Sequence, residues 1–189
     1  MRSPATKLHN FANDKKTFLA KLDKSKKGGL DEKIIPLINI INQKPNYYTT
    51  SSCSGRVYLW TGTGKKNETN WLKVSHDLIN ENFLTYPNSS SLIWLRFEPF
   101  IMHICCTDLE TANNLLEQAR NMYKKSCLLS ISNKIIIEIR GSEFIEMPLY
   151  ENNILLLNKD LTWLKELLNK KMLQMWQTTA KFQEIVKKI

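Results

Sequence analysis

Residues 47–56 read YYTTSSCSGR, in which two aromatic residues are followed by six small hydroxyl or thiol residues, a glycine and an arginine. A half-buried strand normally alternates apolar and polar side chains, and this stretch does not. A plain loop would carry more proline, asparagine or aspartate. We therefore predict two strands, over 47–52 and 56–61, joined through Ser54 and Gly55, with the hydroxyl groups available to a polar ligand.

Helical and strand-like patterns alternate along the rest of the chain, and their order predicts the fold class. The predicted segments are helices over 11–26, between Asp31 and Pro45, over 77–83, over 109–124 and over 158–189, and strands over 71–76, 92–97, 100–106, 127–131 and 134–140. We expect Asp31 and Asp108 to cap the helices that follow them. The order predicts an α+β fold with a mixed or mostly antiparallel sheet flanked by helices, not a doubly wound one.

Residues 158–189 form one long helical pattern with an interrupted apolar stripe. The stripe consists of Leu161, Leu164, Leu168, Met175, Phe182, Ile185 and Ile189. Such a stripe packs either on its own domain or on another protomer, and we expect the former. With 189 residues, 42% of them hydrophobic, the chain can bury one core, so we predict a single domain over 1–189.

The charge of the chain indicates a polyanionic partner. It has 27 Lys and Arg against 18 Asp and Glu, a formal net charge of +9, with a pI near 9.4. Such a balance most often accompanies nucleic-acid binding. The first residues have no apolar segment of a signal peptide and no run could span a bilayer, so we expect a cytosolic protein. Its four cysteines form no C-x-x-C pair, so we expect reduced thiols and no metal site.

Several familiar catalytic templates are missing. Residues 61–65 read TGTGK, which lacks the spacing of a phosphate-binding loop, and no G-x-G-x-x-G motif follows a strand. His76 and His103 are candidates for a general base or a ligand contact, although each alone is more often structural. Cys53 has no evident partner base in the sequence, so we do not predict covalent catalysis by cysteine.

The hydroxyl-rich stretch suits a polar ligand that carries an anionic group. In an extended segment alternate side chains share a face, which groups them as Thr50, Ser52 and Ser54 against Thr49, Ser51 and Cys53. Gly55 allows close approach of a ligand or backbone, and Arg56 offers a planar fork for a phosphate or carboxylate. The alternative is an edge strand with a glycine bulge. A second dense stretch, 23–28 (DKSKKG), either grips phosphates or is a solvated helix end.

Several motifs together resemble the wybutosine-synthesising protein 3 family. They are DKSKKG at 23–28, YTTSSCSGR at 48–56, Trp71, His76, Glu98-Pro99 with His103, Glu138-Ile139-Arg140 and Asn158. The resemblance spans most of the chain and departs from the family at 122–127 (MYKKSC), where the family usually has glycines. It implies an α+β methyltransferase that moves a methyl group from S-adenosylmethionine to a ring nitrogen of a tricyclic guanosine derivative, next to the anticodon of phenylalanine tRNA.

The resemblance and the residue types together give candidate roles. Asp23 and His103 are the candidate catalytic residues. The candidates for cofactor or substrate binding are Ser25, Ser51, Ser52, Cys53, Ser54, Gly55, Arg56, His76 and Glu98. The candidates for tRNA binding are Lys24, Lys26, Lys27, Lys65 and Lys66, and either Trp60 or Tyr48 is expected to stack on a splayed base.

Two other classes of function stay open at this point. One is a non-catalytic RNA-binding protein, in which the SSCSGR strand holds an anion and basic residues follow the RNA backbone. The other is a metabolite-binding module that dimerises through the long C-terminal helix.

Overall fold

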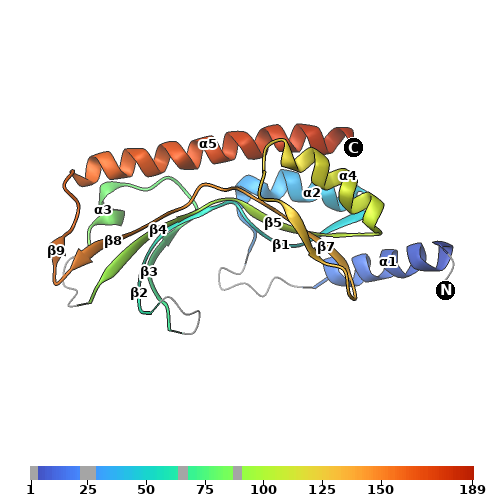
Figure 1. Ribbon diagram of the computed structural model, residues 1–189, viewed down its shortest axis with the longest axis horizontal. Helices are drawn as coiled ribbons and strands as arrows, with labels where there is room; N and C mark the ends of the chain where they lie inside the picture. The colour runs from blue at the N-terminus through green and yellow to red at the C-terminus, as the bar shows by residue number, and fades with distance from the viewer. Residues whose placement is uncertain (1–3, 22–28, 64–67, 87–90) are drawn as a thin grey trace. The chain divides into compact units, whose positions relative to one another are not determined.

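The computed structural model describes residues 4–21, 29–63, 68–86 and 91–189, with side chains from residue 10 onward (Figure 1). The helices are α1 (Pro4–Leu19), the 3-10 helix η1 (Glu32–Ile34), α2 (Ile35–Gln43), α3 (Glu81–Leu84), α4 (Leu109–Arg120) and α5 (Leu161–Lys188). The strands are β1 (Tyr47–Cys53), β2 (Arg56–Thr61), β3 (Asn70–Ser75), β4 (Ile93–Glu98), β5 (Ile101–Cys106), β6 (Cys127–Ser130), β7 (Ile135–Arg140), β8 (Ile145–Glu151) and β9 (Ile154–Leu155).

The chain divides into two compact units. The first unit consists of Met1–Ser54, Phe100–Ser142 and Gln177–Ile189, and the second of Gly55–Pro99 and Glu143–Trp176. Each unit has its own sheet, and the described strands pair antiparallel throughout. The α+β class with antiparallel sheets is confirmed, whereas the single domain over 1–189 stays a prediction.

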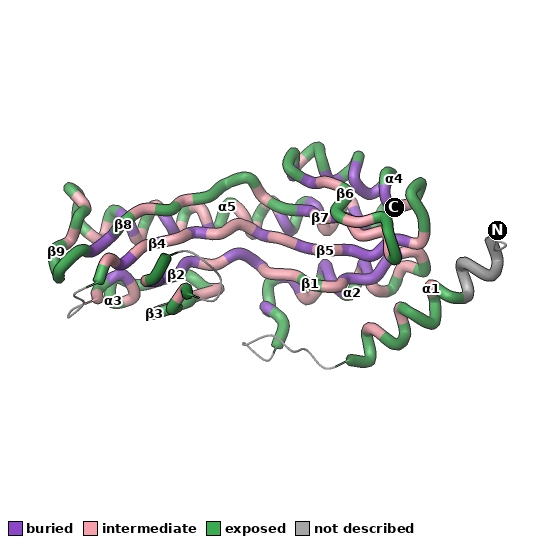
Figure 2. The backbone as a smooth tube through the Cα atoms, turned by 60° about the horizontal axis from the view of Figure 1, so that its bottom comes forward, coloured by how far each residue is buried: buried purple, intermediate pink, exposed green. Residues whose placement is uncertain are grey.

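The first unit is built on a four-stranded sheet in the order β1-β5-β7-β6. Helices α2 and α4 lie on one face of this sheet and α1 on the other (Figure 1). The face under α2 and α4 is apolar, because alternate residues of the central strands β5 and β7 are buried (Figure 2). These residues are Met102, Ile104, Ile137 and Ile139. Asp108 caps α4 as expected, since its Oδ1 accepts a hydrogen bond from the Thr111 N–H at 2.7 Å.

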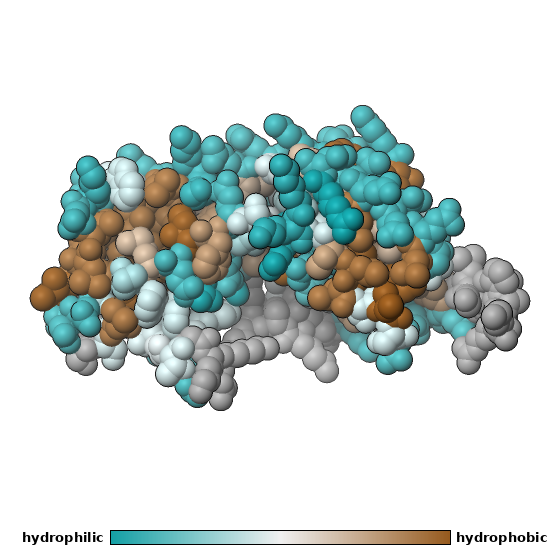
Figure 3. Space-filling view, in the orientation of Figure 1, coloured by the Kyte–Doolittle hydropathy of each residue, from teal (hydrophilic) through white to brown (hydrophobic). Residues whose placement is uncertain are grey.

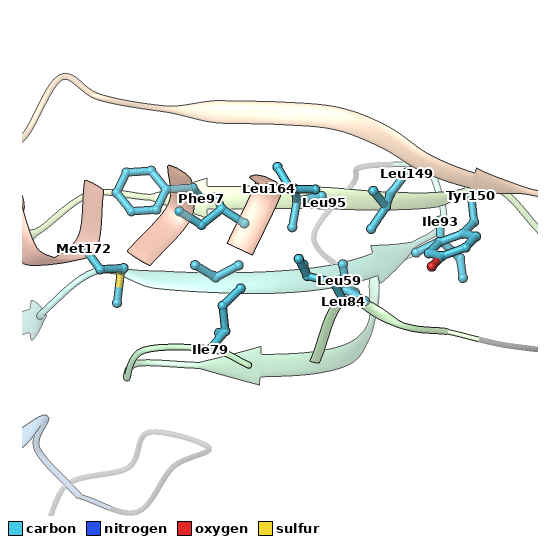
Figure 4. Packing of buried hydrophobic residues seen from close by; sticks show 12 residues of the cluster. Leu59, Ile79, Leu84, Ile93, Leu95, Phe97, Leu149, Tyr150, Leu164 and Met172 are labelled. Atoms are coloured by element: carbon cyan, nitrogen blue, oxygen red, sulfur yellow. The ribbon is translucent and has the colours of Figure 1, made fainter. Parts of the chain in front are cut away.

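The second unit is built on a five-stranded sheet in the order β3-β2-β4-β8-β9. Its core lies between one face of this sheet and the first part of α5 (Figure 4). Alternate residues of β2 and β4 face the helix. Leu59 of β2 and Leu95 of β4, for example, belong to the same buried cluster as Leu164, Leu168 and Met172 of α5. The exposed side of α5 is mostly hydrophilic (Figure 3), and Trp163 and Leu173 are exposed apolar residues on it. The expectation that the C-terminal helix packs on its own chain is therefore confirmed.

The sequence patterns missed one long strand, whereas the two strands joined through Ser54 and Gly55 are confirmed. Strand β8 contains Pro148, a residue that is unfavourable inside a sheet, and it pairs with β4 beside an irregularity in register. Strands β1 and β2 follow one another through Ser54 and Gly55 yet belong to different sheets. None of the described helices has both the length and the apolar composition needed to cross a membrane.

Leu168 tests the contribution of α5 to the core of the second unit. Its side chain is 0% exposed, whereas Leu173 on the same helix is 45% exposed. We expect Leu168→Ala to lower the free energy of unfolding by about 2–5 kcal/mol, because the substitution leaves a cavity. Leu173→Ala should change it by no more than about 0.5 kcal/mol. Urea unfolding followed by circular dichroism measures both, and equal effects would contradict this placement of the helix.

Candidate functional site

The hydroxyl-rich strand β1 contains a bulge that decides which side chains share a face. Thr49 pairs with Ile104 and Ser51 with His103, so Thr50 is the extra residue. Thr49 therefore lies on the buried face with Ile104, and Ser51 lies on the opposite face. The prediction that Thr49 and Ser51 share a face is wrong, because simple alternation does not continue through a bulge.

On that opposite face, four polar side chains of three neighbouring strands form a cross-strand row. Ser51 Oγ lies 3.0 Å from Nδ1 of His103, and Nε2 of His103 lies 3.0 Å from Oε2 of Glu138. Nε of Arg140 lies 3.1 Å from Oε1, the other carboxylate oxygen of Glu138. The strand register places Ser51, His103 and Glu138 directly opposite one another, so the row follows from the sheet itself.

This row has the chemistry of a proton acceptor. When the Glu138 carboxylate accepts the Nε2–H of His103, the lone pair of a neutral imidazole is on Nδ1, next to the Ser51 hydroxyl. The carboxylate also stabilises the imidazolium that forms when Nδ1 takes a proton. Sequence reasoning found His103 and Ser51, but it did not assign a role to Glu138, because the contact depends on strand register.

The junction after β1 is fixed by a buried carboxylate. Asp31 does not cap the following helix through its side chain, so that prediction is wrong. Its Oδ2 instead accepts the backbone N–H of Ser54 at 2.8 Å, and both residues are buried. Because this charge-assisted bond joins two parts of the first unit, it holds the end of the hydroxyl-rich strand in place.

Gly55 is required by both conformation and space. Its φ is +92°, a region that residues with a Cβ rarely adopt. A Cβ at this position would also lie 2.2 Å from Cε of Met175 and 3.1 Å from the carbonyl oxygen of Glu98. Close packing within the second unit therefore explains why a glycine is needed at this position. Sequence reasoning could not identify this cause.

In the second unit, Glu98 lies at the centre of a hydrogen-bonded network. Its Oε2 accepts from Nε and Nη2 of Arg56, at 2.8 and 2.7 Å. Its Oε1 accepts from the Tyr58 hydroxyl at 2.7 Å, and that hydroxyl accepts from Nη1 of Arg96 at 3.0 Å. Arg96 also donates to Oε1 of Glu146, with Nε at 3.1 Å. The planar fork predicted for Arg56 is thus already engaged by a carboxylate of the same sheet.

The aromatic residues predicted to stack on a base are buried, so that prediction is wrong. Tyr48 is 0% exposed and packs against the rings of Phe11 and Phe18, while Nζ of Lys134 donates to its hydroxyl at 2.9 Å. Trp60 is 4% exposed and stacks on another tryptophan of the second unit. The aromatic pattern was correct, but sequence alone did not show which rings reach the surface.

The remaining predicted site residues are distributed as follows. Ser52 and Cys53 are half-buried at the end of β1, and His76 directly follows β3 in the second unit. The candidates that lie outside the described residues are Asp23, Lys24, Ser25, Lys26, Lys27, Lys65 and Lys66.

Sequence comparison connects this chain with a family of known enzymes. The family described as Methyltransferase TYW3 matches residues 13–188. The chain is 34% identical to the tRNA(Phe) 7-((3-amino-3-carboxypropyl)-4-demethylwyosine(37)-N(4))-methyltransferase 1 of Pyrococcus abyssi, over 95% of this chain and 97% of that protein. It is 36% identical to the tRNA wybutosine-synthesizing protein 3 homolog of Xenopus laevis, over 86% of this chain and 68% of that protein.

A solved structure has the same fold. The PH1069 protein from Pyrococcus horikoshii superposes with a TM-score of 0.84 at 31% identity, over 95% of this chain and 97% of that chain. This similarity supports the α+β class and the long C-terminal helix.

The hydroxyl of Tyr58 provides a test of the Glu98 network. Burial, the hydrogen bond to Glu98 and the charge of Glu98 together raise the pKa of Tyr58 to about 12, from an ordinary value of 10.0. The unfolded chain therefore loses this proton at lower pH than the folded one. The resulting stability is complete below pH 10 and is lost as the pH rises toward 12. Urea unfolding at pH 8 and pH 11 should show a smaller loss for Tyr58→Phe than for the native chain; equal losses would contradict the network.

Proposed function

The chain belongs to the TYW3 methyltransferase family, and on this premise we propose that it methylates N4 of a 4-demethylwyosine nucleotide at position 37 of tRNA(Phe), with S-adenosylmethionine as the methyl donor. The observation that supports this activity is the alignment with an archaeal enzyme of that name over nearly the full length of both chains. The formal charge of +9 fits a tRNA substrate. Family membership favours this function over a non-catalytic RNA-binding protein.

The reaction makes limited demands on the protein. A bond forms between the ring nitrogen and the methyl carbon, the bond between that carbon and sulfur breaks, and the proton of the nitrogen must be accepted. Alignment of the three atoms supplies most of the rate enhancement, because it replaces a bimolecular encounter by a fixed geometry. The protein must therefore orient two ligands and provide one proton acceptor.

The small polar residues at the end of β1 fit S-adenosylmethionine. When bound, this cofactor supplies an electrophilic methyl group on a sulfonium. Its amino, carboxylate and ribose hydroxyl groups need partners that both donate and accept hydrogen bonds, which the hydroxyls of Ser51 and Ser52 do. Ser51 is exposed, Ser52 and Cys53 are half-buried, and the bond from Asp31 to the Ser54 N–H fixes the strand end. We assign these residues of the first unit to cofactor or substrate binding, and the roles expected for Gly55, His76 and Ser25 remain predictions.

We assign the proton acceptor to His103. The Glu138 carboxylate on Nε2 directs the accepting lone pair to Nδ1, where Ser51 either relays the proton or gives way to the substrate. Asp23, the other catalytic candidate, remains a prediction, as do the lysines assigned to the phosphate backbone.

Methyl transfer tests the proposed function directly. The purified protein is incubated with isotopically labelled S-adenosylmethionine and tRNA(Phe) that carries 4-demethylwyosine at position 37, with or without the 3-amino-3-carboxypropyl group. We expect nucleoside mass spectrometry to show one added methyl group on at least one of these substrates and none on tRNA with an unmodified guanosine 37. Binding of the tRNA without transfer to either substrate would instead support the RNA-binding alternative.

Substitutions in the cross-strand row test the proton acceptor. We expect His103→Gln to lower kcat by about 10²–10⁴-fold, the usual contribution of a general base. Glu138→Gln should lower kcat less, because an amide can still hydrogen-bond Nε2 of His103 but no longer fixes which ring nitrogen carries the proton. The matched control is Glu117→Gln, an exposed position on α4 of the same unit. An unchanged kcat for both His103→Gln and Glu138→Gln would remove the row from the mechanism.

A further inference from the structure

The sheet of the second unit has a polar and aromatic face opposite the core. Alternation along β2 and β4 directs Leu59 and Leu95 into the core beneath α5. Their neighbours Tyr58, Trp60 and Arg96 therefore lie on the other face. Tyr58 and Trp60 are buried on this face and Arg96 is partly exposed, so the face is covered mainly by its own planar side chains.

Five planar side chains form a stacked row on this face: Trp71, Arg56, Tyr58, Arg96 and Phe144. The Arg56 guanidinium carbon lies 4.6 Å from the centre of the Trp71 ring and 5.1 Å from that of Tyr58. The Arg96 guanidinium carbon lies 5.7 Å from the Tyr58 ring and 5.4 Å from that of Phe144. Aromatic and cationic planes thus alternate across the sheet.

Carboxylates hold the two guanidinium groups of the stacked row in fixed orientations. Glu98 binds Arg56 through two N–H groups, and Glu146 binds Arg96 through Nε and Nη2. Each pair is charge-balanced, so the row presents planar faces more than net charge. Cation–π contacts of this kind are worth only about 0.5–1 kcal/mol at exposed sites.

The ends of the stacked row are exposed aromatic rings. Trp71 is 42% exposed and Phe144 is 52% exposed. Stabilisation of the sheet explains the inner members of the row, but it does not require large apolar rings in water at both ends. Unpaired nucleotides are bound by this combination, because every base has a planar face that stacks on aromatic rings and arginine planes.

We propose that the stacked row binds unpaired nucleotides of the tRNA(Phe) anticodon loop, with bases stacking on Trp71 and Phe144. This inference rests on the proposed function, which places the modified nucleotide in that loop. The positive net charge of the chain attracts the RNA backbone, and the row supplies contacts that depend little on salt.

The test measures the Kd for a fluorescent RNA hairpin with the unmodified anticodon stem and loop, by anisotropy and without S-adenosylmethionine. We expect Trp71→Ala and Phe144→Ala each to weaken binding roughly fivefold to hundredfold, the range for loss of one stacked base. The slope of log Kd against log salt should stay unchanged, because neither ring neutralises a phosphate. Trp71→Phe should keep most of the affinity.

The matched control is Trp163→Ala. Trp163 lies on α5 of the same unit, is 45% exposed and is not part of the stacked row, so we expect native affinity. Circular dichroism establishes whether each variant is folded. If Trp71→Ala is not folded, the affinities of Trp71→Phe and Phe144→Ala test the inference instead. Native affinity in the folded Ala variants, or an equal loss in Trp163→Ala, would overturn the inference.

The two proposals fail in different ways. Loop binding is measured without cofactor on an unmodified loop, so it is independent of methyl transfer. Native loop affinity in Trp71→Ala and Phe144→Ala, together with methylation by the native protein, would overturn only the stacked row. Conversely, weakened loop binding in those variants with no methylation by the native protein would overturn only the proposed reaction.

Discussion

The pairing of Glu98 with Arg56 organises the open face of the second unit. The two residues lie opposite one another on β4 and β2, so the register of these strands brings the charges together. The same carboxylate accepts the Tyr58 hydroxyl, which in turn receives an N–H of Arg96. Glu98 therefore holds Arg56 and Tyr58 directly, and it reaches Arg96 through the Tyr58 hydroxyl, while Glu146 binds Arg96 directly. The orientation of the stacked row depends on these two carboxylates.

A different backbone constraint organises the first unit. The extra residue Thr50 shifts the alternation of β1, so each side chain after it lies on the face opposite to the one that regular alternation would give. Without the bulge, Ser51 would lie on the buried face beneath α2 and α4, and Thr50 would take its place opposite His103. The bulge therefore decides which of several similar hydroxyls meets the imidazole, and the pairing of β5 with β7 adds the carboxylate of Glu138. A hydroxyl-rich strand tolerates such a shift, because its side chains are small and polar.

The sequence predicted what depends on local pattern and missed what depends on register. The long C-terminal helix, the Asp108 cap and most strands follow from periodicity and were confirmed. Strand β8 contains Pro148, an unfavourable strand residue. This residue is tolerated because it pairs with β4 on one side only, and this pairing is visible only in the sheet. Similarly, Glu138 and Glu146 come into place only through pairing of strands distant in sequence. The burial of Tyr48 and Trp60 could not be predicted, since every strand of an antiparallel sheet offers two faces and composition does not say which is covered.

The separation of charge from planar contact bears on how a methyltransferase positions its substrate. Long-range attraction by lysines and arginines concentrates RNA at the surface, but freely rotating cations do not define the position of a base within a fraction of an ångström. Catalysis by alignment needs such definition, because displacement of the reacting nitrogen weakens the in-line geometry. Guanidinium planes held by Glu98 and Glu146 lose little conformational freedom when a nucleotide stacks beside them, so less binding energy is spent on ordering the protein. The charge-balanced stacked row and the proton acceptor share one physical basis. In both, antiparallel strand pairing fixes the side chains before the substrate binds.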